Sequence, residues 1–105
     1  MLKIDDSNLT LEHILPENPN DEWKKVFSKD EILDSVYRIG NFTLLSSSKN
    51  RKIGNEEYEK KKNIYRCSEI LMTKNIEKYY PTWNVESIQK RQEEMAKKAV
   101  NIWNL

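Results

Sequence analysis

Scarce residue types set the first limits on this sequence of 105 residues. Its single cysteine, Cys67, excludes a disulfide within the chain and a zinc knuckle built on cysteine pairs. Only two glycines and three prolines interrupt the sequence, so most of it should be helical. No apolar run approaches the roughly 18 residues that span a membrane, and the start lacks the basic and apolar segments of a secretory signal. We therefore expect a cytoplasmic protein with no membrane partner.

Charged residues are abundant but nearly balanced, with 18 basic and 17 acidic side chains. Their distribution is uneven: residues 1–34 hold nine acids and four bases, whereas residues 35–66 hold three acids and eight bases. A basic middle segment is typical of a surface that binds a polyanion. A solvated helix face rich in lysine would give the same count, so charge alone leaves both interpretations open.

The pattern of apolar, capping and turn residues predicts an α+β fold that is mostly helical. We expect short strands near 10–15 and 42–45, and helices near 21–27, 28–39, 46–53, 55–71 and 84–105. The strands should pair as a short β-hairpin with the 46–53 helix packed across them, and the remaining helices should surround this core. We expect one domain over 1–105, with its core at about 8–65 and a helical extension at 66–105.

Three groups of residues have an ordinary structural interpretation. The apolar stripe from Val85 to Ile102 on the last helix is expected to be core packing. The aromatic residues Trp23, Tyr58 and Trp103 are likewise expected in the core rather than as platforms for stacking bases. The lysines 60–62 are expected to form a solvent-facing surface that raises DNA affinity.

The only histidine, His13, directly follows Glu12 near the end of the first expected strand. Histidine has a suitable intrinsic pKa to deprotonate water near neutral pH. Magnesium keeps several waters, so a carboxylate from Glu12 and an amide oxygen from Asn50 can suffice to hold it. Adjacent strand residues point to opposite faces, so Glu12 and His13 reach one site only if the strand ends between them, which Pro16 permits. A histidine beside a glutamate is more often an ordinary surface or packed residue, so spacing alone does not establish phosphodiester hydrolysis.

Three linked motifs carry a family resemblance: "LEHILPENP", "IGNFTLLSSSKNRK" and "GNEEYEKKK". Together they resemble the HNH nuclease motif, also called the His-Me finger or ββα-metal motif. More closely, they resemble the C-terminal nuclease domain of GmrSD-type modification-dependent restriction endonucleases. The HNH domain of RNA-guided CRISPR nucleases is similar in the same three places. The resemblance covers roughly residues 8–65, and it implies a metal-dependent DNA endonuclease that hydrolyses phosphodiester bonds.

The resemblance implies a role for each matching residue of the site. His13 matches the general base that activates water, and Glu12 matches the metal-binding position before it, which is usually Asp. Asn50 matches the helix asparagine that completes the metal site, and Asn41 matches a strand asparagine that orders the loop around the histidine. The longer Glu12 side chain shifts the carboxylate by about one bond length, which affects the metal geometry. Because asparagine replaces the family's final histidine, the site should be oxygen-rich and suit Mg²⁺, or Mn²⁺, over zinc.

The surroundings of this site suggest partners. Lys49, Arg51 and Lys52 flank Asn50 and are candidates for DNA-phosphate binding, with solvated helix charge as the alternative. The resemblance also implies that this chain is the C-terminal fragment of a larger restriction or anti-phage defence enzyme. In that enzyme an N-terminal domain hydrolyses nucleotide and helps to select modified phage DNA. Two other functions stay open: a catalytically weak or inactive DNA-binding module with an HNH-like fold, and a helical assembly domain that dimerises through its last helix.

Overall fold

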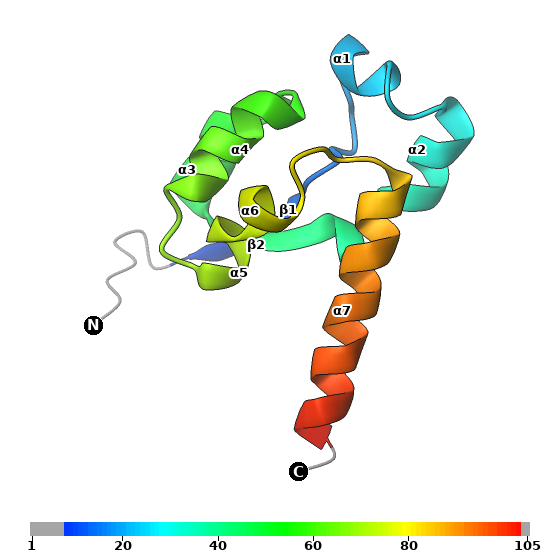
Figure 1. The fold of residues 1–105 in the computed structure, drawn as a ribbon. Coiled ribbons are helices and arrows are strands. Elements are labelled where there is room, and N and C mark those ends of the chain that lie inside the picture. The colour runs from blue at the N-terminus through cyan, green and yellow to red at the C-terminus, as the bar shows by residue number, and fades with distance from the viewer. Residues whose placement is uncertain (1–7, 104–105) are drawn as a thin grey trace.

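Two antiparallel strands lie at the centre of the computed structural model, which describes residues 8–103 (Figure 1). Strand β1, Leu9–His13, pairs with β2, Phe42–Ser46, in a register that sets Glu12 opposite Thr43 and His13 opposite Phe42. Helices surround this pair, so the predicted α+β class, mostly helical with a paired two-stranded core, is confirmed.

The segment between the strands forms two short helices that begin where their capping residues predict. Helix α1, Asp21–Lys24, starts after Asn20, whose side chain accepts hydrogen bonds from two backbone N–H groups. Helix α2, Lys29–Ser35, starts with a complete capping box between Ser28 and Glu31. A single 3-10 turn, η1 at Ile39–Asn41, then leads directly into β2. The helices predicted near 21–27 and 28–39 therefore begin within one residue of the expected starts, but they end earlier, at Lys24 and Ser35.

Two further helices cover one side of the strands. Helix α3, Ser47–Ile53, packs against β1, β2 and α4. It ends at Gly54, whose φ of 47° lies in the left-handed region that favours glycine. Helix α4, Tyr58–Arg66, lies beside α3 (Figure 1). Both helices were predicted, and α3 has the predicted end.

The helix predicted over 55–71 is shorter and interrupted in the structure. Helix α4 ends at Arg66, and a turn separates it from α5, Leu71–Lys74, and α6, Ile76–Tyr79. Helix α5 packs on β2, where Thr43 and Thr73 share a buried hydrogen bond of 2.7 Å. That contact requires the chain to fold back, which explains why local propensity alone predicted too long a helix.

The longest helix, α7 at Val85–Trp103, is anchored by its first half. Ile88 is fully buried, and a Cβ atom added at Gly40 would lie 2.2 Å from the Ile88 carbonyl oxygen, so only glycine permits this approach to η1. The guanidinium of Arg91 donates to the carbonyl oxygens of Gly40 and Phe42. Burial lowers the pKa of Arg91.

The second half of α7 projects away from the strands (Figure 1). Ala99 is exposed and Val100 is 55% exposed, so the prediction that the whole apolar stripe packs in the core is wrong here. The periodicity is present, but no described element covers this face. The predicted core positions of Ile102 and Trp103 lie outside the side chains that the structure describes.

The described hydrophobic core is rich in aromatic residues. The predicted core positions of Trp23 and Tyr58 are confirmed, with 2% and 8% of their surfaces exposed. The Tyr58 and Trp83 rings stack at 5.7 Å between centroids, and the Trp23 indole donates to the Glu56 carbonyl oxygen at 2.8 Å. Among the described helices, none is both long and apolar enough to cross a membrane.

Candidate active site

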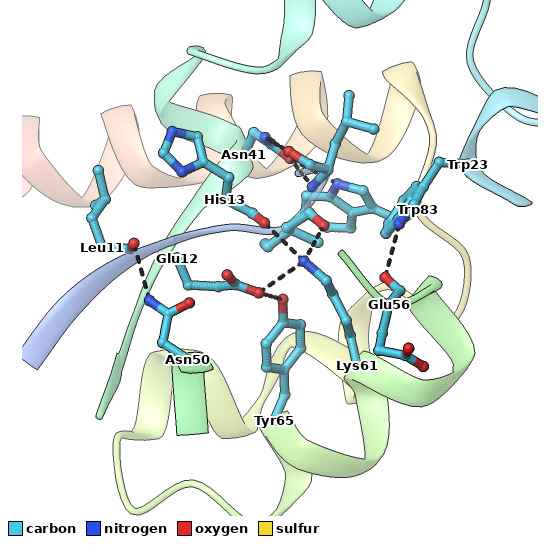
Figure 2. Close-up of polar contacts among 12 residues, drawn as sticks. Leu11, Glu12, His13, Trp23, Asn41, Asn50, Glu56, Lys61, Tyr65 and Trp83 are labelled. Carbon is cyan, nitrogen blue, oxygen red and sulfur yellow. Dashed lines mark hydrogen bonds and ion pairs between the residues drawn. The ribbon is translucent and has the colours of Figure 1, made fainter. Parts of the chain in front are cut away.

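Glu12 points from β1 towards α4 and is almost completely buried. Its Oε2 atom accepts hydrogen bonds from the Lys61 ammonium at 2.9 Å and from the Tyr65 hydroxyl at 2.7 Å (Figure 2). The hydrogen bonds described for this carboxylate all involve Oε2. The other oxygen, Oε1, therefore stays available to a ligand.

Lys61 is the buried partner of Glu12, with no exposed surface. Its ammonium also donates to the carbonyl oxygens of His13 at 3.0 Å and Ile14 at 2.9 Å, so all three of its N–H groups have acceptors. Burial lowers the pKa of Lys61, and the attraction of Glu12 opposes that shift. The prediction of a solvent-facing lysine surface is therefore wrong for Lys61, although Lys60 is exposed as predicted.

The helical repeat explains why Lys61 is buried. Tyr58, Lys61 and Tyr65 stand three and four residues apart on α4 and share its buried face. Burial, reinforced by the charge of Glu12, raises the pKa of Tyr65 well above its usual value, so this hydroxyl remains a hydrogen-bond donor at neutral pH.

Asn50 reaches the same region from α3. Its Nδ2 atom donates to Thr10 Oγ1 at 2.7 Å and to the Leu11 carbonyl oxygen at 3.3 Å. These bonds fix the amide, and in Figure 2 its oxygen lies on the side of the Glu12 carboxylate. No hydrogen bond is described for Asn50 Oδ1, so this oxygen is also available to a ligand.

An open pocket of about 460 Å³ joins these groups. It is lined by Leu11, Glu12, His13, Pro16, Glu17, Asn18, Asn50, Gly54 and Asn55. Six waters occupy roughly 180 Å³ at the liquid density of about 30 Å³ each, so a hydrated cation fits with room to spare. The structure therefore brings together at one pocket three of the residues singled out from the sequence.

The His13 ring is directed differently from the Glu12 carboxylate. It lies on the other side of β1 (Figure 2). There it makes T-shaped contacts with the Phe42 ring, at 4.9 Å between centroids, and with the Tyr37 ring, at 5.7 Å. The strand does not end between Glu12 and His13 but runs through both, so the break that would aim both side chains at one point is not present. The ring is half-buried, and no hydrogen bond is described for its nitrogens.

Asn41 is fully buried and holds the turn that follows His13. Its Oδ1 accepts from the Leu15 backbone N–H at 2.8 Å and from the Trp83 indole at 3.0 Å. Its Nδ2 donates to the carbonyl oxygens of Leu15 at 2.9 Å and Val36 at 3.0 Å. An asparagine that orders the loop around the histidine would make contacts of this kind.

The candidate phosphate-binding residues differ in their exposure and in their hydrogen bonds. Lys49 is half-buried and donates to the Cys67 carbonyl oxygen at 3.1 Å. Arg51 and Lys52, in the last turn of α3, are exposed, and no ion pair is described for either. Of these three candidates, Arg51 and Lys52 are therefore the two that are exposed and have no described ion pair.

Comparison of the sequence with models of protein families identifies the family of this chain. The model for the C-terminal domain of GmrSD restriction endonucleases matches residues 2–98. The chain belongs to this family. A search of curated proteins and a search of solved structures each returned no match.

This GmrSD C-terminal domain has a donor set suited to one class of cation. Among residues 8–100, no three His, Cys, Asp or Glu side chains group as a metal site. Instead, Asn50 and Glu12 line the pocket, and each has one side-chain oxygen, a neutral amide oxygen and a carboxylate oxygen, for which no hydrogen bond is described. Hard cations such as Mg²⁺ take oxygen ligands and keep several waters, so these residues fit that group.

Two residues that sequence reasoning missed are Lys61 and Tyr65. Both were visible as members of one helical face with Tyr58, but a run of three lysines suggested a solvated surface. The signal that could have found Lys61 is its position three residues after one aromatic residue and four before another. In this GmrSD domain, Glu12 and its buried partner Lys61 are thus 49 positions apart in sequence.

Proposed function

We propose that the chain is a metal-dependent DNA endonuclease domain of the HNH type. The observation that carries this proposal is the pocket where Glu12 and Asn50, from separate elements, each present an oxygen with no described hydrogen bond, beside His13. Membership of a restriction-endonuclease domain family implies DNA as the substrate.

Each residue has a distinct task in this proposal. Glu12 Oε1 and Asn50 Oδ1 would hold a divalent cation, Mg²⁺ or Mn²⁺. When bound, this cation neutralises charge on the scissile phosphate and on the departing oxygen. His13 accepts a proton from a water, whose oxygen forms a bond to phosphorus while the bond to the 3′ oxygen breaks. No hydrogen bond is described for its nitrogens, and we propose that rotation of the half-buried ring about its side-chain bonds brings them to the strand edge.

DNA and the parent enzyme complete the proposal. Arg51 and Lys52, and Lys49 through its remaining N–H groups, hold phosphates beside the scissile one. We further propose that the domain acts in the cytoplasm on modified phage DNA, selected by an N-terminal nucleotide-hydrolysing domain of a larger protein. Cleavage by this domain alone is then weak and unselective.

Nicking of supercoiled plasmid in Mg²⁺ tests the reaction. We expect His13→Ala to reduce nicking at least about 100-fold, which is typical for loss of a general base. We expect Asn50→Ala to reduce nicking as well, because it removes one of the two oxygens proposed to hold the cation. Asn55→Ala is the matched control, because Asn55 lines the same pocket but donates its amide to the Asn18 carbonyl oxygen. Equal nicking by the wild type and His13→Ala would remove His13 from the mechanism.

A non-catalytic DNA-binding module is the second candidate. The observation that favours it is the ion pair between Glu12 and Lys61 together with the direction of the His13 ring. Fluorescence anisotropy with a labelled duplex distinguishes the two. Binding that is lost in an Arg51→Glu/Lys52→Glu double variant, with no nicking by the wild type in Mg²⁺ or Mn²⁺, supports the module and contradicts the endonuclease.

A further inference from the structure

Lys61 and Tyr65 form a buried clamp on one atom of the candidate cation site. Both donate to Glu12 Oε2, at 2.9 and 2.7 Å. The ammonium is itself fixed by the carbonyl oxygens of His13 and Ile14, at the end of β1. A buried charge is tolerated only with such complete pairing, so this oxygen is not readily released.

The clamp decides how many oxygens Glu12 can offer. With Oε2 held by two donors, only Oε1 can reach the pocket. Calcium takes six to eight oxygens and often binds both oxygens of a carboxylate, whereas magnesium takes six in a strict octahedron with several waters. A carboxylate limited to one oxygen therefore suits the smaller cation.

We propose that Lys61 and Tyr65 are positioning residues that make the pocket select Mg²⁺ or Mn²⁺ over Ca²⁺ by confining Glu12 to a single ligand oxygen. This inference rests on the proposed function, because it concerns the same cation site. A clamp that served only to join α4 to β1 would change stability when broken, but it would leave the relative affinities for these cations unchanged.

Competition for bound Mn²⁺ tests the clamp. Free Mn²⁺ is measured by its electron paramagnetic resonance signal while Mg²⁺ or Ca²⁺ is added to the folded chain. The readout is the ratio of the two displacing concentrations. Because Mg²⁺ and Ca²⁺ carry the same charge, this ratio cancels general electrostatic effects and any loss of folded protein.

Tyr65→Phe removes one donor and keeps the ring. We expect the ratio to move towards Ca²⁺ by about fivefold, the equivalent of one neutral hydrogen bond. Tyr58→Phe is the matched control, because the Tyr58 hydroxyl donates to the Tyr80 carbonyl oxygen and not to Glu12. It should leave the ratio unchanged. Lys61→Gln, which removes the charge of the second donor and shortens its side chain, should move the ratio in the same direction as Tyr65→Phe.

Three other outcomes overturn the inference, and they differ in what they say about function. An unchanged ratio in both Tyr65→Phe and Lys61→Gln, with Mn²⁺ binding abolished by Glu12→Gln, rejects the clamp and keeps the cation site. An equal shift in Tyr58→Phe shows that the change is not specific to Glu12. Mn²⁺ binding that is absent, or indifferent to Glu12→Gln, rejects the cation site itself and with it the proposed endonuclease.

Discussion

Glu12 and His13 are neighbours on β1, yet they lie in opposite surroundings. On one face, the Glu12 carboxylate is buried and held by charged and neutral donors. On the other, the His13 imidazole is half-buried and lies against the Phe42 and Tyr37 rings. The carboxylate is thus fixed by the fold before any ligand arrives, whereas the imidazole keeps the freedom to turn. We therefore expect changes on the two faces to have different consequences.

The largest effect on stability should come from the Glu12 face. Lys61→Met leaves a buried carboxylate without its counter-charge, which should lower the free energy of unfolding by about 3–5 kcal/mol. Urea unfolding followed by circular dichroism measures this change. Lys60→Met, at an exposed position of the same helix, should leave the free energy of unfolding nearly unchanged, because its ion pair with Glu56 is exposed to solvent.

A double variant sharpens this prediction. Glu12→Leu/Lys61→Met replaces both partners by apolar groups and should recover most of the loss, because no buried charge is left unpaired. If Lys61→Met alone is as stable as the wild type, the Glu12 face is not held together by this pair, and the contrast between the two faces fails.

An intermediate effect on stability is expected at Asn41, which holds the turn that follows His13. Asn41→Ala removes four hydrogen bonds from a fully buried position, and it should destabilise the fold by about 3 kcal/mol. The comparison is Asn50→Ala, which loses two partly exposed bonds and should cost about 1 kcal/mol. Thermal unfolding of both variants would reveal the order, and the reverse order would contradict the structural role assigned to Asn41.

The smallest effect on stability is expected on the His13 face. His13→Ala removes two ring contacts from a half-buried side chain and should cost about 1 kcal/mol or less. The same variant is expected to lose plasmid nicking, so it separates activity from stability. A loss of stability as large as that of Lys61→Met would show that His13 is a structural residue.

Local signals in the sequence predicted much of the fold. The caps at Asn20 and Ser28, the glycine at position 54 and the apolar strand before Ser46 all mark real boundaries. The break after Arg66 was not predictable in this way, because it depends on a buried contact between Thr43 and Thr73. Local patterns thus defined element starts, and distant packing defined where the fourth helix ends.

The candidate site was predictable in its members but not in its geometry. The family motif singled out Glu12, His13 and Asn50, and all three line one pocket. The direction of the His13 ring follows from a strand that continues through Glu12 and His13, where convergence of the two side chains would have required a break. The buried partner Lys61 was hidden within a basic run, since charge usually signals exposure. Pairing across 49 positions is a tertiary fact that no local pattern contains.

The close contact between Gly40 and α7 couples the position of this helix to that of η1. Gly40 lies so close to the Ile88 carbonyl oxygen that a side chain would not fit between them. Movement of α7 along or about its axis would therefore displace η1. Gly40 is bonded covalently to Asn41, which grips Leu15 through two hydrogen bonds. A displacement of the projecting half of α7 would therefore be transmitted through Gly40 and Asn41 to the turn that follows His13.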